Sequence, residues 1–237
     1  MTDIIILDDV TVKLIAHMGG DASIVQAARV SVQGENEIVM MEPGARDAGL
    51  INYLMREKHG SPFEAVVFKF YVKAPIFVFR EFMRHRIASY NEISGRYSKL
   101  APEFYIPNAD RKLVNIGTSA RPEFAPGTRE QVIGTAARLE SAYQDAWDAY
   151  EWFLEGGIAN EVARMILPVG IMSQMYVTMN LRSIFNFLSL RIQDETAVHV
   201  SKPQREIEMV AQKMEAEVAK ICPIAYKTFI EHGRVAP

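Results

Sequence analysis

The residues that could do chemistry gather in segment 84–98, which reads Arg-His-Arg-Ile-Ala-Ser-Tyr-Asn-Glu-Ile-Ser-Gly-Arg-Tyr-Ser. From Arg80 to Lys99 the chain carries five basic and two acidic side chains, whereas the whole chain has a net charge of −3. Guanidinium groups and the backbone N–H groups of a Ser- and Gly-rich turn can converge on phosphate oxygens. A basic cluster on an acidic protein therefore indicates an anion site, most simply one for a phosphate.

The same kinds of residue can also be explained without a ligand. Arg80 and Arg84 are four residues apart on an expected helix and could form a solvated basic stripe. Glu92, the one acid inside the basic turn, could pair with a neighbouring arginine or accept a hydrogen bond from a ligand N–H or ribose hydroxyl. His59 could cap a helix end. His85 stands between two arginines, which should disfavour its charged form.

A second polar group lies on an expected helix over 181–191 and at its start. Its members are Asn180, Arg182, Asn186, Ser189 and Arg191. Three of them follow the spacing i, i+4, i+7 and share one face of a largely apolar helix, which predicts a buried helix. A buried Arg or Asn needs a partner, either a ligand or another subunit. Asn180 could simply cap the helix, and Arg164, in the apolar segment 162–168, also needs a partner.

Other classes of site lack their signatures. The five His residues show no paired ligand spacing, and neither a Walker loop nor a Gly-x-Gly-x-x-Gly fingerprint occurs, so no metal site is expected. The single cysteine, Cys222, excludes an intrachain disulfide and fits a reducing compartment, and we expect it to be a packed apolar residue. Without an apolar run of membrane-spanning length or a basic leader, a cytoplasmic location is expected.

The elements that must position these residues are a mixture of strands and helices. We expect strands at 4–7, 64–73 and 174–178, and helices at 22–30, 45–58, 76–86, 130–154, 160–166, 181–191 and 206–221, with a shorter helix after Pro223. Residues 33–44 should be a polar loop and residues 101–127 a long irregular excursion. The 237 residues are 49% hydrophobic and show no linker or repeat, so a single α+β domain over residues 1–237, with more helix than strand, is expected.

The triplet Arg84-His85-Arg86, followed after seven residues by Ser94, resembles the signature of the flavin-dependent thymidylate synthase family. Ser89, Asn91, Glu92, Gly95, Arg96, Tyr97 and Ser98 also stand where that family has them. Further blocks occur in family order at 27–31, 59–64, 104–107, 162–164, 167–168, 180–183, 186–187 and 190–191. The resemblance therefore covers most of the chain.

This resemblance implies an α+β fold with a mixed or antiparallel sheet, working as a homotetramer in which several subunits build each site. It implies reductive methylation of dUMP at C5 to give dTMP. The carbon donor would be 5,10-methylenetetrahydrofolate, and NADPH would reduce FAD, the hydride source. The protein would hold three flat molecules in register and stabilise negative charge on the uracil ring. Nucleic acids and membranes are not among the implied partners.

By motif match, the FAD contacts would be Ser31, His59, Ser61, Arg84, His85, Arg86, Glu92, Asn180, Leu181, Arg182 and Asn186. The dUMP contacts would be Glu81, Phe82, Met83, Arg84, Glu92, Ile93, Ser94, Gly95, Arg96, Arg164 and Arg191. Arg191 would also assist ionisation at uracil N3. Ser94 would bind dUMP without acting as a nucleophile, since no base is placed to activate it. The single cysteine lies outside every motif block, unlike the cysteine that attacks uracil C6 in cysteine-dependent thymidylate synthases.

The sequence departs from the family pattern in two places. Glu81 stands where the family commonly has Gln, and an acid is unfavourable beside a nucleotide monophosphate. The segment 192–205 is longer than usual and contains a Ser-Lys-Pro turn at 201–203, which we expect to reshape a loop at the edge of the site.

Two further functions remain open at this stage. The basic segment could serve a nucleotide- or nucleic-acid-binding protein, although the acidic balance and the second polar group speak against it. The chain could also be a flavoprotein that oxidises NADPH but has lost methyl transfer, through Glu81 or the longer 192–205 segment. Salt-sensitive DNA binding without flavin would support the first function, and dTMP formation would eliminate the second.

Overall fold

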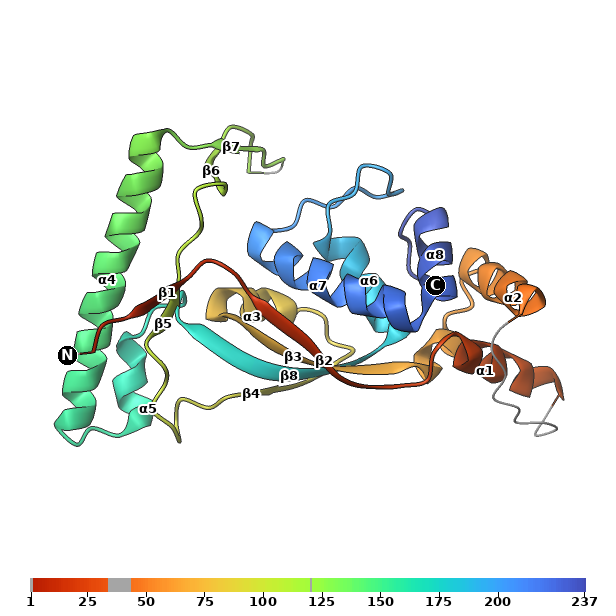
Figure 1. The fold of residues 1–237 in the computed structure, drawn as a ribbon, viewed down its shortest axis with the longest axis horizontal. Coiled ribbons are helices and arrows are strands. Elements are labelled where there is room, and N and C mark those ends of the chain that lie inside the picture. The colour runs from red at the N-terminus through yellow and green to blue at the C-terminus, as the bar shows by residue number, and fades with distance from the viewer. Residues whose placement is uncertain (1, 34–43, 120) are drawn as a thin grey trace. The chain divides into compact units, whose positions relative to one another are not determined.

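The computed structural model describes residues 2–33, 44–119 and 121–237, with the side chains of residues 31–33 left out. The chain forms two compact units (Figure 1). Unit 1 comprises Met1–Thr11, Lys73–Phe82 and Glu92–Met175, and unit 2 comprises Val12–Val72, Met83–Asn91 and Tyr176–Pro237. Each unit is therefore built from segments that lie far apart in the sequence.

In its described residues, unit 1 contains three short helices, one long helix and two small strand pairs. Strand β1 (Ile5–Leu7) runs parallel to β5 (Glu103–Tyr105), and β6 (Lys112–Asn115) pairs antiparallel with β7 (Phe124–Pro126). The helices are α3 (Ile76–Phe82), α4 (Arg129–Glu155), α5 (Asn160–Ala163) and the 3-10 turn η2 (Arg164–Ile166). The region 101–127, expected to be irregular, thus contains three strands.

Helix α4 begins at a capping box and packs its aromatic face into the core of unit 1. Thr128 Oγ1 accepts from the N–H of Gln131, and the Gln131 side chain accepts from the N–H of Thr128. Tyr143 stacks on Phe104 with 4.8 Å between ring centroids, and Trp147 is completely buried. These contacts bind α4 to the β1–β5 pair.

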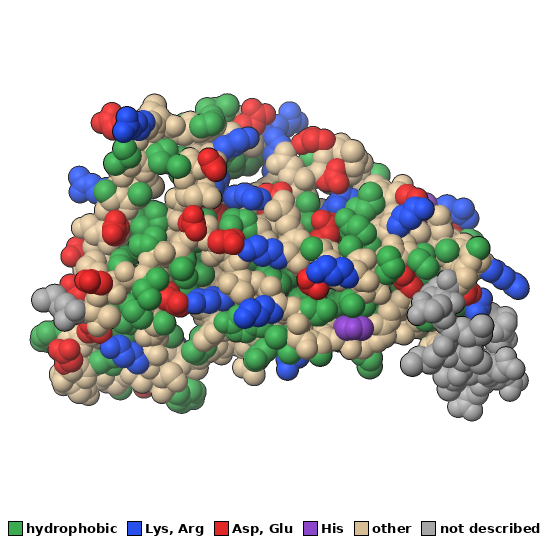
Figure 2. All heavy atoms as spheres, in the orientation of Figure 1, with side chains coloured by type: hydrophobic (Ala, Val, Ile, Leu, Met, Phe, Trp, Pro, Cys, Tyr) green, Lys and Arg blue, Asp and Glu red, His purple; other side chains and the backbone are tan. Residues whose placement is uncertain are grey.

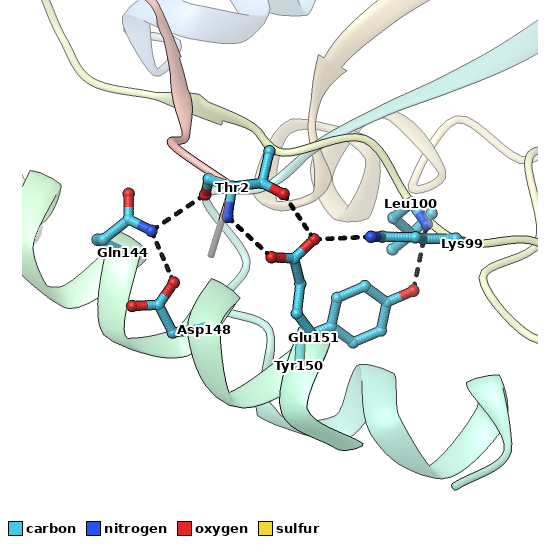
Figure 3. A network of polar contacts seen from close by, with 7 residues as sticks. All are labelled: Thr2, Lys99, Leu100, Gln144, Asp148, Tyr150 and Glu151. Atoms are coloured by element: carbon cyan, nitrogen blue, oxygen red, sulfur yellow. Dashed lines mark hydrogen bonds and ion pairs between the residues drawn. The ribbon is translucent and has the colours of Figure 1, made fainter. Parts of the chain in front are cut away.

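A polar network anchors the end of the basic segment to α4 (Figure 3). The carboxylate of Glu151 accepts hydrogen bonds from Thr2 N at 3.0 Å, Thr2 Oγ1 at 2.9 Å and Lys99 Nζ at 2.7 Å. The Tyr150 hydroxyl accepts from the N–H of Leu100 at 3.2 Å. The hydrogen bond from Lys99 is the largest cause that lowers the pKa of Glu151 to about 2.

Unit 2 contains most of the helices. They are α1 (Asp21–Gln33), α2 (Ala45–Arg56), the 3-10 turn η1 (Ser61–Ala65), α6 (Leu181–Arg191), α7 (Arg205–Ile221) and α8 (Pro223–Glu231). Helix α7 packs on α6 and α8 (Figure 1). In the core of this unit the ring of Phe185 stacks on Phe229 with 4.5 Å between centroids, and Phe63 meets Phe185 edge-on. Cys222 is completely buried, and burial raises the pKa of its thiol, which confirms it as a packed residue.

A four-stranded sheet has the order β2 (Thr11–Met18), β3 (Val67–Pro75), β8 (Met172–Asn180) and β4 (Ser89–Glu92). Along β3 the residues alternate, with Phe68 and Phe70 buried and Lys69 exposed. Strand β3 begins later than expected because residues 61–65 form η1, with Pro62 in its first turn. Strands β2 and β4 were not expected.

The mixed α+β class and the excess of helix over strand are confirmed. Parallel and antiparallel pairings both occur. The expected polar loop 33–44 lies outside the described residues, apart from Gln33 at the end of α1 and Gly44 before α2. In the parts of the chain that the structure describes, no helix combines the length and apolarity needed to cross a membrane.

Candidate active site

The helix of the basic segment ends earlier than expected. Helix α3 stops at Phe82, Met83 and Arg84 form a turn, and His85 and Arg86 follow in an irregular segment. The expected helix, which continued through the triplet, is therefore wrong in its last turn, and Arg80 and Arg84 do not share a helix face. The cause is burial: Phe82 is completely buried, whereas Ile87 is 74% exposed, so a longer helix would bury no further apolar side chain.

His85 is buried, with 8% of its surface exposed, whereas Arg84 and Arg86 are exposed. Its Nε2 accepts a hydrogen bond from Nε of Arg191 at 3.1 Å. Its ring meets the ring of Phe187 edge-on, with 4.8 Å between centroids. The fold of unit 2 thus brings together two predicted site residues that are 106 positions apart in the sequence.

The protonation of His85 follows the expected direction but has a different main cause. Burial, and after it the charge of Arg191, lower the pKa of His85 from 6.5 to about 4. The sequence had suggested the flanking arginines as the cause. The Tyr90 hydroxyl donates to the backbone carbonyl of His85 at 2.6 Å, and burial raises the pKa of Tyr90 to about 12. Both rings are therefore uncharged at neutral pH.

Arg182, in the first turn of α6, is held by two acceptors. Its Nη1 lies 2.7 Å from Glu64 Oε1, and its Nε lies 3.0 Å from the carbonyl oxygen of Pro237. A Cβ added at Gly60 would lie 2.3 Å from Arg182 Nε, so a larger residue at this position would force the guanidinium group to shift. Arg182 and Asn186 are exposed within the single chain, so the expected partner of their helix face, a ligand or another subunit, stays a prediction. The buried face of α6 is the apolar one, formed by Ile184, Phe185, Phe187 and Leu188.

The start of α6 contains two more residues predicted to contact FAD. Asn180 caps the helix, since its Oδ1 accepts from the N–H of Ser183 at 2.9 Å. The side chain of Leu181 is completely buried, and its N–H donates to the carbonyl of Val66 at 2.8 Å. The capping interpretation of Asn180 is thus confirmed.

The other predicted FAD residues of unit 2 lie on its helices and turns. His59 and Ser61 are exposed beside and within η1, and the ring of His59 meets that of Tyr53 edge-on at 5.8 Å. The N–H of His59 donates to the carbonyl of Leu54 after the end of α2. Ser31 lies in α1, and its side chain is outside the described residues.

In unit 1, a buried hydroxyl group holds the carboxylate of Glu92. Ser173 Oγ donates to Glu92 Oε1 at 2.6 Å, and Ser173 is 6% exposed. The sequence left open that Glu92 pairs with a neighbouring arginine. The structure instead shows its carboxylate bound to Ser173, across the neighbouring strands β8 and β4. A carboxylate held by one donor keeps lone pairs for other hydrogen bonds.

Residues 94–98 form a tight turn in unit 1. The N–H groups of Tyr97 and Ser98 donate to the carbonyl of Ser94 at 3.2 and 3.3 Å, and the N–H of Arg96 donates to Ser94 Oγ at 3.3 Å. The turn is joined to β8 by the N–H of Ile93, which donates to the carbonyl of Gln174 at 2.9 Å.

Two guanidinium groups lie at this turn. Nε and Nη2 of Arg96 each lie 3.1 Å from Glu161 Oε2. A Cβ added at Gly95 would lie 3.4 Å from Cδ of Arg164, so Arg164 passes beside the turn. Both arginines are exposed. This arrangement of two forked donors at a Ser-Gly turn can bind a phosphate.

The remaining predicted dUMP residues have mixed exposure. Phe82 is completely buried, Glu81 is half-buried, Met83 is 39% exposed and Ile93 is 37% exposed. Phe82 and Glu81 belong to unit 1, whereas Met83 belongs to unit 2 with Arg191. All these assignments remain predictions.

The segment 192–205 is tied to the end of α6. Ser201 Oγ donates to the carbonyl of Leu190 at 2.6 Å, and the N–H of Val198 donates to the carbonyl of Gly233 at 3.0 Å. Arg234 lies 3.6 Å from Asp194. Segment 192–205 thus lies next to the helix turn that carries Arg191.

Charged side chains of both signs are interspersed on the face shown in Figure 2. Acidic groups lie among the basic ones, which is unlike the basic stripe typical of a nucleic-acid-binding domain. Within the described ranges, no three His, Cys, Asp or Glu side chains gather in a way that could hold a metal ion.

Three contributing residues escaped the sequence analysis. Ser173, Glu161 and Glu64 hold Glu92, Arg96 and Arg182 across 81, 65 and 118 sequence positions. Ser173 and Glu161 are single polar residues outside a recognisable motif, whereas Glu64 ends the family block 59–64. That block could have pointed to Glu64, and the position of Ser173 in a strand adjoining the site could have pointed to Ser173.

A comparison with protein families matches residues 13–224 to the family described as "Thymidylate synthase complementing protein". A flavin-dependent thymidylate synthase from Streptomyces avermitilis is 52% identical over 231 residues, which cover 97% of this chain and 94% of that protein. One from Tropheryma whipplei is 48% identical over 235 residues, covering 99% of this chain and 98% of that protein.

Solved structures agree with this similarity. The UMP/dUMP methylase PolB from Streptomyces cacaoi, bound with 5-Br dUMP, superimposes with a TM-score of 0.93 at 42% identity and covers 99% of this chain and 100% of its own. The same protein bound with 5-Br UMP gives a TM-score of 0.92 at 41% identity, with 99% of each chain covered. The motif, the fold and the relatives agree, and this chain belongs to the flavin-dependent thymidylate synthase family.

Proposed function

We propose that this chain converts dUMP to dTMP by reductive methylation at uracil C5. FAD is its cofactor, 5,10-methylenetetrahydrofolate its carbon donor and NADPH its reductant. The similarity to thymidylate synthases over almost the whole chain supports this activity. The structural observation that carries it is the contact between His85 of the Arg-His-Arg motif and Arg191.

The residues present in unit 2 fit FAD. Exposed hydroxyl, imidazole and amide groups lie at and near η1 and on α6, namely Ser61, His59 and Asn186, and the guanidinium groups of Arg84, Arg86 and Arg182 are exposed as well. Guanidinium groups suit a pyrophosphate, and the hydroxyl and amide groups suit ring and ribityl hydrogen bonds. FAD, when bound and reduced, supplies the hydride that the new methyl group needs.

The turn 94–98 and its two arginines fit the phosphate of dUMP. Arg96 and Arg164 are exposed at the turn, and backbone N–H groups of the turn add further donors. Glu92, fixed by Ser173, is suited to accept a hydrogen bond from a ribose hydroxyl or ring N–H. These residues bind and orient dUMP and take no part in bond making.

Arg191 stabilises negative charge that develops on the uracil ring. A guanidinium group beside N3 favours loss of the N3 proton and holds the anion by charge-assisted hydrogen bonds. Its neighbour His85 is neutral, so Arg191 supplies a positive charge at this point and the imidazole adds no second one. The protein thus assists the reaction electrostatically, without a protein nucleophile.

We also propose that residues 1–237 act as one domain and that four copies assemble, with each site shared between subunits. The exposed side chains predicted to contact FAD support this, because a partner copy would complete their surroundings. Large apolar side chains are also exposed on unit 1, among them Trp152 at 69% and Met165 at 78%, as expected of a surface that meets another chain.

The experiment that tests this function is a visible absorbance titration. The purified protein should show a flavin spectrum, and addition of dUMP should shift it, because substrate and flavin lie in one site. UMP, tested in parallel because the similar PolB is a UMP/dUMP methylase, should shift it less. A colourless protein that takes up no added FAD would overturn the proposal, and salt-sensitive DNA binding would then favour the phosphate-binding alternative.

A further inference from the structure

By motif match His85 is predicted to contact FAD, but that match says nothing of its contacts within the chain. Its ring is buried between Phe187 and Arg191, and its backbone carbonyl accepts from the Tyr90 hydroxyl. The residue is thus connected to α6 by two contacts and to β4 by one. The ring itself is contacted by Phe187 and Arg191, and its Nε2 is already used by Arg191 within the chain.

The direction of the Arg191–His85 hydrogen bond follows from chemistry. A guanidinium group can only donate, so Nε2 of His85 must accept. A neutral imidazole that accepts at Nε2 carries its hydrogen on Nδ1. An imidazolium would instead set an N–H against an N–H and a positive charge against another. The contact therefore requires one tautomer of one protonation state.

The contact engages one edge of the guanidinium group. Nε is bound to His85, whereas the four terminal N–H donors of Arg191 lie on the other edges of the same rigid plane. Fixing Nε therefore fixes the directions of the terminal donors. This matters because small errors in the placement of a charge-stabilising group cost much of its effect.

We propose that His85 is a positioning residue for Arg191, holding the guanidinium plane in the orientation that the ionised uracil ring needs. The inference rests on the proposed function, in which Arg191 stabilises that ring. A positioning role makes the rate of methyl transfer depend on His85. A residue that only contacts the cofactor need not have this effect. Phe187 supports the role by packing against the ring, and Tyr90 supports it by holding the backbone carbonyl of His85.

The test compares two variants of similar side-chain length. His85→Gln keeps an acceptor at the reach of Nε2, whereas His85→Met fills the space without one. We expect H85M to lower kcat for dTMP formation by about tenfold to hundredfold, with a small change in the KM for dUMP, and H85Q to recover most of the lost rate. Flavin absorbance and thermal melting show whether each variant is folded and loaded. Equal rates for H85M and wild type, or equal losses in H85M and H85Q, would overturn the inference.

A double-variant cycle tests whether His85 acts through Arg191. Arg191→Lys keeps a positive charge but has no Nε, so H85M should cost little further rate in that background. A full additional loss would contradict the proposal.

A spectroscopic measurement covers the case in which H85M does not fold. In wild-type protein with ¹⁵N-labelled histidine, His85 should show the neutral tautomer with its hydrogen on Nδ1. The opposite tautomer would overturn the contact. A wild-type protein that forms no dTMP would overturn the proposed function and the role of His85 in the reaction. The tautomer of His85 would still show whether the hydrogen bond with Arg191 exists.

Discussion

The hydroxyl of Ser173 donates a 2.6 Å hydrogen bond to Glu92 and is itself almost completely buried. The contact orients Glu92, the one acidic side chain in segment 84–98. Ser173→Ala removes the donor and leaves the space nearly unchanged. Because one such bond contributes about 1 kcal/mol, the KM for dUMP should rise by roughly fivefold.

Steady-state kinetics at saturating folate and NADPH would measure this effect. Ser141→Ala, at an exposed position on α4, is the control and should leave the KM unchanged. An S173A protein with wild-type KM would show that the orientation of Glu92 does not matter for dUMP.

We expect Glu161 to compete with the phosphate of dUMP for Arg96. Both side chains are half exposed, and two nitrogens of Arg96 lie 3.1 Å from Glu161 Oε2. In Glu161→Gln the attraction is weaker, so dUMP should bind about twofold to fivefold more tightly, while stability changes by less than about 1 kcal/mol. Equilibrium titration of the flavin spectrum with dUMP measures the affinity.

A matched control exists on α7. Glu217→Gln weakens the exposed ion pair with Lys220 and should leave dUMP affinity as it is. Weaker binding in E161Q would mean that the Glu161 contact helps to place Arg96 and does not compete with the substrate.

Gly60 leaves room for Arg182. Since a Cβ there would lie 2.3 Å from Arg182 Nε, Gly60→Ala should displace the guanidinium group and weaken flavin retention by on the order of tenfold. Gly49→Ala, in α2 with open space around it, should keep the flavin and stabilise the fold slightly. The flavin-to-protein absorbance ratio after gel filtration compares them, and equal ratios would exclude Arg182 as a cofactor contact.

Acid should weaken the anchor at Glu151. The network in Figure 3 lowers the pKa of this carboxyl from 4.5 to about 2. Since the folded pKa lies below the unfolded one, the ionised group stabilises the fold above about pH 4.5, and this contribution is lost as the pH falls toward 2. The free energy of unfolding should therefore decrease over this range more in wild type than in Glu151→Gln.

Denaturant unfolding across this pH range, with E217Q as the exposed control, measures the difference. If the free energy of unfolding changes with pH in the same way in wild type and E151Q, the stabilising role assigned to Glu151 is contradicted.

Local patterns predicted much of the fold. Helix α6 was expected over 181–191 and has those bounds, because Asn180 caps it and apolar residues fill its inner face. Strand β2 was missed because none of its residues is buried, so it lacks the alternation expected of a strand with one buried face. The helix through the Arg-His-Arg triplet was overextended because helical spacing alone does not show which apolar residues find a core.

The site was predictable in its motif residues but not in their supports. The partners of His85, Glu92 and Arg182 lie 106, 81 and 118 positions away. Such contacts arise when distant segments meet in the fold, and neither periodicity nor motif spacing encodes them. The sequence therefore proposes which side chains act, and the structure shows which residues they contact within the chain.

The central claim is tested most directly by measuring dTMP formation. Purified protein is incubated with dUMP, 5,10-methylenetetrahydrofolate, NADPH and FAD, and the nucleotides are separated by chromatography. We expect dTMP in the complete mixture and none when dUMP, the folate or NADPH is omitted, while Arg191→Ala should keep its flavin and form no dTMP. Oxidation of NADPH without dTMP in the wild-type protein would contradict the claim and leave a flavoprotein that has lost methyl transfer.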